Sequence, residues 1–490
     1  MVAPLCAAMF HGRTNSQEIR RNATMTADTA NEIAQGTELL NTVLERTPTT
    51  RVVSFGYDTA LNIGQLIRDH HGNRQVVCIA DETTWAAAGD RVDHSLSSLD
   101  QANRIVLPAR PRPYANIELV HRVRDALAET PGALPIAIGS GTINDAVKLA
   151  AAELETPYWV VGSAPSMDGY TAAGASISKD GFKQNMACPA PYGVIMDLDI
   201  LKTAPQIMWA SGFGDMIGKI SALADWRIAD TVGVESVDPW VWELAERSAL
   251  DALSDPAGVG ARSESALPSL TVGLLMSGLS IQAYNSSRPG SGAEHMFSHM
   301  WEMDHVGLDF DPPLSHGAKV GIGSVLVAAL YDELLELDLA ATDITARLSQ
   351  WPSVNEALTL VNALHSTDAM RSVADSQLPK KHPDLHELER RLRAAVAAWP
   401  MLRTELRRLM KPADEIRDSL VKAGAHHHPQ QVGLDRDRIR VDYLRLRSTR
   451  DRYTSVDLAE ETGILPGIVD TMFGPGGIWQ EWPAESRSIN

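Results

Sequence analysis

Four residues of this 490-residue chain have the types and spacing of a divalent metal site. His295 and His299 stand four residues apart in the segment PGSGAEHMFSH, so a helix there carries both imidazoles on one face. His316 follows in SHGAK, and Asp215 supplies a carboxylate in GFGDMIGK. A carboxylate with two imidazoles can bind zinc or a similar ion. Each of these residues taken alone is more often structural, and the spacing leaves open whether three of them converge.

A helix start is predicted just before His295. Ser291 and Glu294 follow a Pro-Gly turn and have the spacing of a capping box, in which the two side chains cap the first turn reciprocally. Because Glu294 precedes His295 instead of following it, the segment is not the HExxH motif of zinc proteases. A further helix is predicted to begin at His316.

A second candidate site lies in the run PIAIGSGTINDAVK, residues 135–148. The pattern predicts a buried strand, a glycine turn and a helix. Glycines let a ligand approach the backbone, and the first N–H groups of a helix favour an anion such as a pyrophosphate. Asn144 occupies the last glycine position of the GxGxxG fingerprint, so the motif is only moderately specific.

Asp81 ends the predicted strand QVVCIA and has two possible roles. Its carboxylate can accept the ribose hydroxyls of a dinucleotide and would repel a 2′-phosphate, which favours NAD over NADP. It can equally cap the helix that follows. The spacing does not separate these alternatives.

The elements that position these residues follow from hydrophobic patterning. Between Arg51 and Asp197, β-rich runs alternate with helical stretches, which predicts a mainly parallel sheet with βαβ connections. After Asp199 the pattern is helical. The predicted strands are residues 51–55, 75–80, 104–107, 134–138, 158–162 and 193–197, and the predicted helices include 214–229, 239–253, 318–337, 386–398 and 455–462. We predict a loosely ordered extension over 1–34, an α/β NAD-binding domain over 35–205 and an all-helical metal- and substrate-binding domain over 206–490.

Composition excludes several classes of partner. With 62 acidic and 44 basic residues the formal charge is −18, which argues against strong general binding to nucleic acid or anionic lipid. The three cysteines are too dispersed for a disulfide framework or a cysteine zinc site. Apolar runs fall short of the roughly 20 residues that a membrane span needs. We therefore expect a cytoplasmic protein without a membrane span.

Taken together, the motifs resemble sn-glycerol-1-phosphate dehydrogenase, a family of the superfamily of iron-containing alcohol dehydrogenases and dehydroquinate synthase. The resemblance runs from about Arg51 to Phe473 and includes a last stretch, RDRYTSVDLAEETGIL, typical of bacterial members. It implies a dehydroquinate synthase-like fold, NAD or NADP with NAD favoured, one divalent metal (zinc or nickel, with iron possible), a small phosphorylated substrate and often a homodimer. The stretches that carry it are GSGTINDAVK, APSMDGYTAAGASI, SGFGDMIGKISALADW, SRPGSGAEHMFSH and HGAKVGIG.

The resemblance also implies residue roles. Asp215, His295 and His316 would hold the metal, with Asp215 also touching substrate, while Asp168 and His299 would bind substrate. The residues implied at the dinucleotide are Gly139, Ser140, Gly141, Thr142, Ile143, Asn144, Asp145, Ser163, Ala164, Pro165, Ser166 and Ala172. Two positions depart from many members of the family, because Ala172 replaces a Ser and Ser140 replaces a Gly.

The implied reaction is the reduction of dihydroxyacetone phosphate by NAD(P)H to sn-glycerol 1-phosphate. A metal would polarise the carbonyl, and His299 is a candidate proton donor. For the substrate phosphate we expect Lys219 and Arg288, which lie beside the metal motifs. Three alternatives stay open: a dehydrogenase of another polyol, a dehydroquinate synthase-like cyclase on the same scaffold, and a non-catalytic binding protein.

Overall fold

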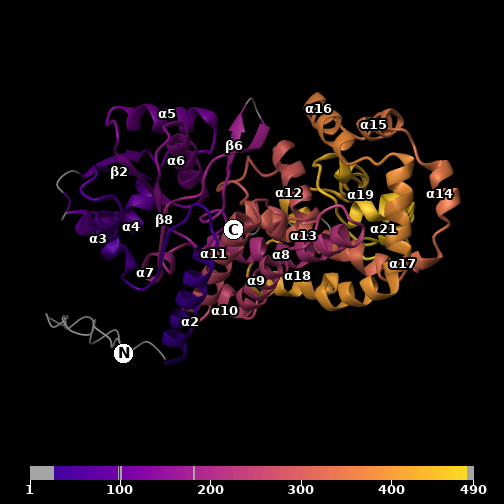
Figure 1. Cartoon of the computed structure of the whole chain (residues 1–490), viewed down its shortest axis with the longest axis horizontal. Helices are drawn as coiled ribbons and strands as arrows, with labels where there is room; N and C mark the ends of the chain where they lie inside the picture. The colour runs from indigo at the N-terminus through magenta and orange to yellow at the C-terminus, as the bar shows by residue number, and fades with distance from the viewer. Residues whose placement is uncertain (1–26, 98, 100–101, 180–181, 483–490) are drawn as a thin grey trace, which may run out of the picture.

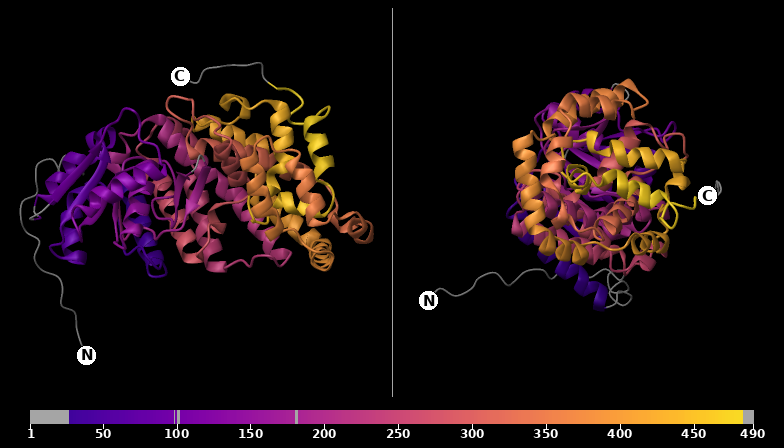
Figure 2. Two further views of the ribbon diagram at one scale, coloured as in Figure 1. Left: turned by 90° about the horizontal axis from the view of Figure 1, so that it is seen from above. Right: turned by 90° about the vertical axis from the view of Figure 1, so that its right-hand side faces the viewer.

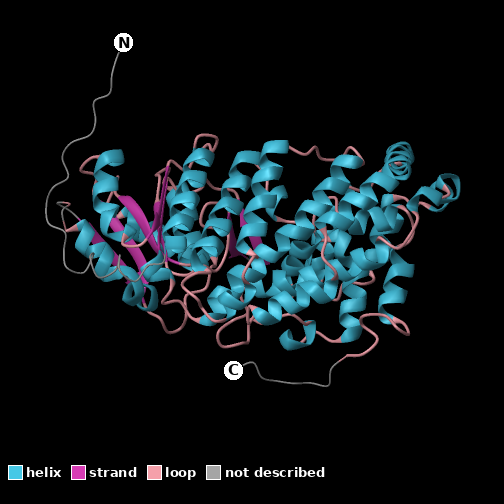
Figure 3. Ribbon diagram, turned by 90° about the horizontal axis from the view of Figure 1, so that it is seen from below, coloured by secondary structure: helices cyan, strands magenta, loops and turns pink. Residues whose placement is uncertain are grey.

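The structure is a computed structural model that describes residues 27–97, 99, 102–179 and 182–482. An α/β part built around a sheet comes first, and a wholly helical part follows it (Figures 1 and 3). The two parts lie end to end along the longest axis, as the view from above shows (Figure 2). Within the described residues, no helix is long and apolar enough to cross a membrane.

The sheet is six-stranded and all its pairings are parallel, in the order β1-β8-β5-β4-β2-β3. All six strands predicted from the sequence are confirmed. Their bounds are β1 Val52–Gly56, β2 Val76–Asp81, β3 Ala102–Leu107, β4 Leu134–Gly139, β5 Trp159–Gly162 and β8 Gly193–Asp197. A small antiparallel hairpin of β6 (Ala175–Lys179) and β7 (Phe182–Met186), which was not predicted, lies beside the helical part (Figure 1).

Both faces of the sheet are covered. Along β2, Val77 and Ile79 belong to one hydrophobic cluster, whereas Val76 and Cys78 belong to another. Successive side chains of a strand point to opposite faces, so a strand buried on both faces is apolar throughout. The helices of this part are α2 Ala27–Leu44, α3 Ile63–His71, α4 Glu82–Leu96, α5 Ile117–Ala128, α6 Gly141–Glu153 and α7 Leu198–Leu201.

Helix α2 departs from the expected N-terminal extension. We expected loose order up to residue 34, but the structure is helical from Ala27, and the earlier residues of the extension lie outside the described part. Leu40 and Val43 are each only 1% exposed. The helix packs against β1 and against α11 (Leu267–Tyr284), and this burial of apolar side chains explains why it is ordered.

The helical part is built around two long, buried helices, α8 and α13, which contact each other along their length. The predicted helix at 214–229 is confirmed but is longer, and the predicted helix at 386–398 continues through Pro400. Its helices are α8 Gln206–Thr231, α9 Pro239–Ala252, α10 Pro256–Gly260, α11 Leu267–Tyr284, α12 Ala293–Met303, α13 His316–Leu334, α14 Ile344–Gln350, α15 Val354–Asn362, α16 Asp368–Gln377, α17 Leu385–Leu409, α18 Ala413–Lys422, α19 Arg436–Arg445, α20 Ser455–Glu461 and α21 Leu465–Phe473.

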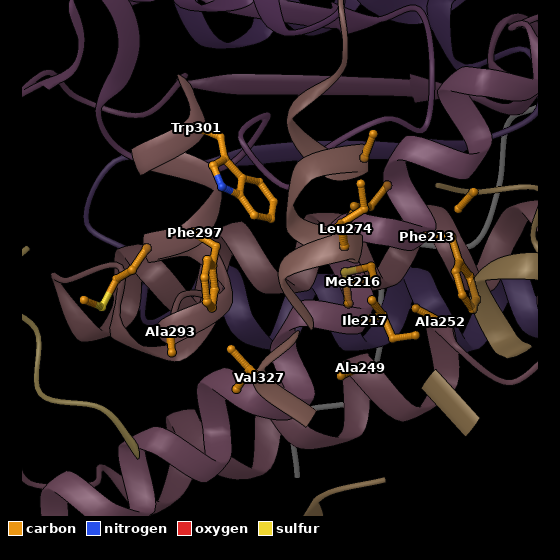
Figure 4. Packing of buried hydrophobic residues seen from close by; sticks show 14 of the residues in the cluster. Phe213, Met216, Ile217, Ala249, Ala252, Leu274, Ala293, Phe297, Trp301 and Val327 are labelled. Carbon is orange, nitrogen blue, oxygen red and sulfur yellow. The ribbon is translucent and has the colours of Figure 1, made fainter. Parts of the chain in front are cut away.

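A continuous apolar core fixes α8, α11, α12 and α13 relative to one another. Phe213 and Met216 on α8 lie near Leu274 on α11, while Phe297 and Trp301 extend the core along α12 (Figure 4). All five side chains are 0% exposed. Because a close-packed interior resists small displacements, polar groups attached to these helices are held in fixed positions.

One buried carboxylate links this core to the C-terminal helices. Asp225 on α8 is 0% exposed and accepts hydrogen bonds from the backbone N–H groups of Ala293 and Ser455, at 2.8 and 2.9 Å, and from the Tyr331 hydroxyl at 2.6 Å. Burial raises the pKa of Asp225 to about 6. The carboxyl group therefore holds a proton in the folded protein at pH values where an unfolded chain releases it.

We expect this group to make stability fall with rising pH over a defined window. An unfolded Asp titrates near pH 4, so between about pH 4 and pH 6 the folded state binds more protons than the unfolded state, and the free energy of unfolding decreases by roughly 2 to 3 kcal/mol. Urea denaturation of the wild type and of Asp225→Asn, at matched pH values, isolates this contribution. The advantage of the wild type over the variant should shrink as the pH rises and then level off above the folded pKa. Parallel pH curves for the two proteins would contradict the assignment.

Candidate metal and substrate site

Three side chains with metal-binding chemistry converge between α8, α12 and α13. The possible ligand atoms of Asp215, His295 and His316 all lie within 4.8 Å of one another. His295 Nε2 is 3.7 Å from Asp215 Oδ1, and the ring centroids of His295 and His316 are 5.3 Å apart. Asp215 is 0% and His295 is 6% exposed. One carboxylate and two imidazoles at this spacing suit a divalent ion, whose charge would also compensate for burying the carboxylate.

Glycines allow the helices that carry these groups to approach closely. A Cβ on Gly317, the residue after His316, would lie 1.8 Å from the backbone oxygen of Ser211 on α8. A Cβ on Gly214, the residue before Asp215, would lie 2.3 Å from the backbone oxygen of Gly317. Both obstacles are backbone atoms, which cannot rotate away. The two helices therefore meet backbone to backbone beside the candidate ligands.

Two carboxylates hold the imidazoles: Glu294, which the sequence analysis named only as a helix cap, and Glu302, which it did not name. Glu294 Oε1 lies 2.7 Å from His295 Nδ1, and Glu302 Oε1 lies 3.1 Å from His316 Nδ1. Burial opposes ionisation of Glu294, but its hydrogen bond with His295 lowers the pKa of the carboxyl group. A carboxylate on one ring nitrogen orients the ring and leaves the other nitrogen for a metal. The sequence could have indicated that Glu302 lies beside an imidazole, because it stands three residues after His299 and therefore on the same face of that helix.

The predicted capping box at this helix is wrong. The N-cap of α12 is Gly292, and no side chain caps it. Glu294 does reach back, because its Oε1 accepts from the N–H of Gly292 at 2.6 Å, but Ser291 stands one residue too early to be its partner. The same carboxylate oxygen thus serves the helix start and His295 together.

His299 lies beside the cluster but outside the group of candidate ligands. Its ring centroid is 6.3 Å from that of His295 and 6.0 Å from that of His316. Its Nδ1 is 3.4 Å from Glu302 Oε2, so a single carboxylate faces both His299 and His316. Burial lowers the pKa of His299 to about 4. The ring is therefore neutral at pH 7.

Lys219 joins the candidate ligand Asp215 to Asp168. Its ammonium lies 2.8 Å from Asp168 Oδ2 and 2.9 Å from Asp215 Oδ1, and it donates to the Gly290 carbonyl at 3.0 Å. Burial opposes charge on Lys219, but the two carboxylates raise its pKa above the ordinary value. Asp168 also accepts a hydrogen bond from the Ser277 hydroxyl at 2.8 Å, and its own backbone N–H donates to Asp215 Oδ2 at 2.9 Å. The structure thus places Asp168 directly against the cluster.

The structure does not bring Arg288 to this cluster. Its side chain is 0% exposed, and its two terminal nitrogens donate to the carbonyls of Tyr453 and Asp225 at 2.7 and 2.6 Å. Its Nε lies 3.5 Å from a carboxylate oxygen of Glu235. The donors that we expected to meet a phosphate are therefore used to tie α8 to the segment before α20.

The predicted phosphate-binding loop lies at the carboxyl end of β4. Gly139 is the last residue of β4, Gly141 the first of α6, and Ser140 between them forms no side-chain capping bond. A Cβ on Gly139 would lie 2.7 Å from Ile143 Cβ, and one on Gly141 would lie 3.2 Å from Met167 Sδ. Packing therefore favours glycine at position 139, whereas at position 141 the Met167 side chain would have to shift by a few tenths of an ångström. The loop keeps the strand-turn-helix geometry that can bind an anion through backbone N–H groups.

The residues that follow this loop have structural partners. Asn144 is 0% exposed and is bonded to the Gly169 carbonyl and the Tyr158 hydroxyl. Asp145 Oδ2 accepts from the Ser176 N–H at 3.1 Å. Asn144 and Asp145 thus connect the start of α6 to the segment that contains Asp168. Lys148, one turn further along, adds hydrogen bonds from its ammonium to the carbonyls of Gly169, Ala172 and Gly174 at 2.9 to 3.0 Å.

The second predicted wall of the dinucleotide site is the segment Ser163–Ser166. Its first residue is bonded to β4, since the Ser163 N–H donates to the Gly139 carbonyl at 3.1 Å. Its last residue is bonded to α8, since the Ser166 carbonyl accepts from the Ser211 hydroxyl at 2.9 Å. The segment therefore runs from the glycine loop to the helix that carries Asp215. It connects the two predicted sites physically.

Asp81 caps helix α4. Its Oδ1 accepts from the N–H groups of Thr83 and Thr84 at 2.8 and 2.9 Å, which completes a capping box with the Thr84 hydroxyl. Strands β2 and β4 are hydrogen-bonded neighbours, so Asp81 also lies at the same edge of the sheet as Gly139. The capping role is observed, and it leaves the other carboxylate oxygen for a ribose.

The fold has known counterparts. A family model described as iron-containing alcohol dehydrogenase matches residues 54–205. Glycerol dehydrogenase from Schizosaccharomyces pombe aligns over 90% of this chain and 95% of its own, with a TM-score of 0.53 and 14% identity. Sulfoacetaldehyde reductase from Bifidobacterium kashiwanohense, solved in complex with NAD+, aligns over 86% and 96%, with a TM-score of 0.54 and 12% identity. The fold is that of the iron-containing alcohol dehydrogenases.

Relatives found by sequence identify the family within this fold. Glycerol-1-phosphate dehydrogenase [NAD(P)+] from Bacillus subtilis is 35% identical over 270 residues, which are 54% of this chain and 68% of the relative. The enzyme of the same name from Bacillus licheniformis is 29% identical over 405 residues, which are 82% of this chain and 86% of the relative. The chain belongs to the glycerol-1-phosphate dehydrogenase family.

Proposed function

We propose that this chain catalyses the NAD(P)H-linked reduction of dihydroxyacetone phosphate at C2 to sn-glycerol 1-phosphate. The observation that carries the proposal is the convergence of Asp215, His295 and His316 within 4.8 Å, directly beside the Asp168–Lys219 pair. Membership of the family supplies the reaction. The geometry supplies a place where a carbonyl oxygen and an adjacent hydroxyl can be bound together.

The residues fit one divalent metal, and we propose Asp215, His295 and His316 as its ligands. Asp215 Oδ1 already faces Lys219, but a carboxylate oxygen has more than one lone pair and can serve both. When bound, the metal supplies Lewis-acid stabilisation of the negative charge that develops on the substrate oxygen, and the dinucleotide supplies the hydride. Zinc, nickel and iron all suit this ligand set, so metal analysis of the purified protein has to identify the ion.

Asp168 and His299 have distinct roles in this proposal. Asp168 Oδ1 takes part in no hydrogen bond found among the described residues, so it is available to accept the free hydroxyl of the substrate. Reduction also requires one proton for the substrate oxygen, which we assign to His299. Because the ring is neutral, it passes a proton on instead of losing its own: it takes up a proton from solvent, to which its 33% exposed side chain has access, and releases that proton to the substrate oxygen, while Nδ1 stays against Glu302.

We propose that the dinucleotide binds along the carboxyl edge of β4, with its pyrophosphate at Gly139–Asp145 and against Ser163–Ser166. Ala172 and Ser140 would lie beside it. In this proposal residues 35–205 form the NAD-binding domain, and residues 206–490 form the metal- and substrate-binding domain. A homodimer is part of the same proposal, and sedimentation equilibrium of the purified chain tests it.

Replacing Asp81 by Asn tests cofactor preference without removing the helix cap. The amide oxygen can still accept from Thr83 and Thr84, but the charge that would repel a 2′-phosphate is lost. We expect the ratio of kcat/KM for NADPH to that for NADH to rise by roughly tenfold, which corresponds to about 1.4 kcal/mol. An unchanged ratio in a variant of wild-type stability would mean that Asp81 only caps α4.

An assay of the purified, metal-loaded protein tests the reaction itself. Dihydroxyacetone phosphate should cause loss of NADH absorbance, and chiral analysis of the product should give sn-glycerol 1-phosphate. A dehydrogenase of another polyol would prefer glycerol or dihydroxyacetone, and a dehydroquinate synthase-like cyclase would act on a sugar-acid phosphate without net change in NADH. Absence of turnover with all of these substrates would favour a non-catalytic binding protein.

A further inference from the structure

Two arginines beside the candidate site share the same serine partners. Arg450 donates to the hydroxyls of Ser291 and Ser287 at 3.4 and 3.1 Å. Arg452 donates to the Ser287 hydroxyl at 2.9 Å and to the Ser291 carbonyl at 2.5 Å. Both guanidinium groups therefore lie against one short turn of the chain, with their charges side by side.

Neither arginine of this pair is in direct contact with a carboxylate among the described residues. Within the part of the chain that the structure describes, neither Arg450 nor Arg452 forms an ion pair, whereas the buried guanidinium of Arg445 pairs with Asp442 at 2.7 Å. Of the surrounding acids, Asp451 stands between the two arginines in sequence and is exposed, Glu235 faces Arg288, and Glu294 binds His295.

Burial makes this excess of positive charge costly. Arg452 is only 9% exposed and Arg450 is half-buried. Burial, followed by the charge of Arg450, lowers the pKa of Arg452. Two cations without a direct ion pair in such a place are unfavourable unless an anion joins them.

The pair adjoins the proposed substrate position. The turn that the arginines contact also includes Gly290, whose carbonyl accepts a hydrogen bond from the Lys219 ammonium at 3.0 Å. The same ammonium pairs with Asp168, so the turn lies close to Asp168. The arginines therefore contact, from the side of the C-terminal segment, the same short turn that Lys219 contacts beside Asp168.

We propose that Arg450 and Arg452 bind the phosphate group of the substrate, in the place that the sequence analysis gave to Arg288 and Lys219. This inference rests on the proposed function and names the phosphate subsite of the same site. Arg288 is 0% exposed and its Nε lies 3.5 Å from a Glu235 carboxylate oxygen, and Lys219 is held between two carboxylates. Arg450, in contrast, is half-buried and donates to serine hydroxyls. A planar guanidinium offers parallel N–H groups that match a phosphate, and two of them neutralise its dianion.

The test compares a phosphorylated and an unphosphorylated substrate in the same variant. With Arg450→Gln, kcat/KM for dihydroxyacetone phosphate should fall on the order of 10- to 100-fold, mainly through KM, as expected for loss of a charged hydrogen bond. Activity with dihydroxyacetone should stay within about twofold, because that substrate has no phosphate to lose. Arg450→Lys, which keeps the charge, should be intermediate. Arg440→Gln, which removes an exposed arginine paired with Asp470, is the matched control and should change neither activity.

A second measurement needs no variant. Inorganic phosphate should protect Arg450 of the wild-type holoenzyme from phenylglyoxal, as mapped by mass spectrometry, and should compete with dihydroxyacetone phosphate in the assay. Equal losses on both substrates in Arg450→Gln, no loss on either, or no protection by phosphate would overturn the subsite. If the wild type does not reduce dihydroxyacetone phosphate but phosphate still protects Arg450, the proposed function fails while the anion site stands.

Discussion

We expect His295→Ala to lose both its bound metal and its turnover. The imidazole is 6% exposed, lies 3.7 Å from Asp215 and is oriented by Glu294, so no other side chain can take its place. Loss of several kcal/mol of electrostatic stabilisation of the substrate oxygen corresponds to a decrease in kcat on the order of 10³-fold or more. Elemental analysis of protein that has been loaded with metal and then desalted gives the metal content, and steady-state assays of the same samples give the activity.

A second ligand variant separates loss of metal from loss of stability. His295→Ala leaves the buried Glu294 carboxylate without its imidazole, which by itself destabilises the protein. His316 is a better test, because its side chain is 29% exposed and its replacement disturbs less of the core. His316→Ala should also lose metal and activity, whereas His386→Ala, on an exposed part of α17, should keep both. Full turnover by metal-free protein would disprove the proposed role of the cluster.

We expect Gly317→Ala to destabilise the fold and to separate the candidate ligands. The added methyl group would lie 1.8 Å from the Ser211 backbone oxygen and 2.6 Å from its carbonyl carbon, so α13 has to move away from α8. Overpacking of this kind costs about 3 kcal/mol, and more where only backbone can yield. His316, the preceding residue, would move with α13, so metal affinity should fall together with stability.

Urea denaturation and metal titration of Gly317→Ala measure the two effects. The matched control is Gly467→Ala, within α21, where an added Cβ meets nothing within 4 Å. Alanine has the higher helix propensity, so this control should be neutral or more stable by up to about 1 kcal/mol. A Gly317→Ala protein with wild-type stability and metal affinity would show that the helices are not held by backbone contact there.

Much of the fold could be predicted because its signals are local. The strands from Val52 to Gly162 alternate with helices, and each strand carries an apolar run that is readable from a few residues. The start of α13 at His316 was predicted correctly, and the structure adds that Ser315 is its N-cap. The start of α12 was not, since Glu294 binds the N–H of Gly292 rather than joining Ser291 in a capping box. The sequence allows the helix to start after either Ser291 or Gly292, and the spacing of Glu294 does not decide which of the two is the N-cap.

Long-range polar contacts could not be predicted in the same way. Arg288 stands next to the metal motif in sequence, yet its guanidinium is bonded to carbonyls of Tyr453 and Asp225. Arg450 is far from that motif in sequence, yet it contacts Ser287 and Ser291. Proximity along the chain says little about where a long side chain finds its partners, because the packing of several helices decides it.

The sequence by itself determined the alternation of strands and helices, the glycine turn after β4 and the placement of His295 and His299 on one helix face, since each depends on neighbours within a few residues. Only the tertiary structure decided that Asp215 meets His295 and His316, that Glu302 faces both His299 and His316, and that Arg450 and Arg452 share the partners Ser287 and Ser291. Each of these contacts depends on how helices that are distant in sequence pack against one another, both in their crossing angle and in their separation. That packing is set by the whole core and by backbone contacts such as the one at Gly317.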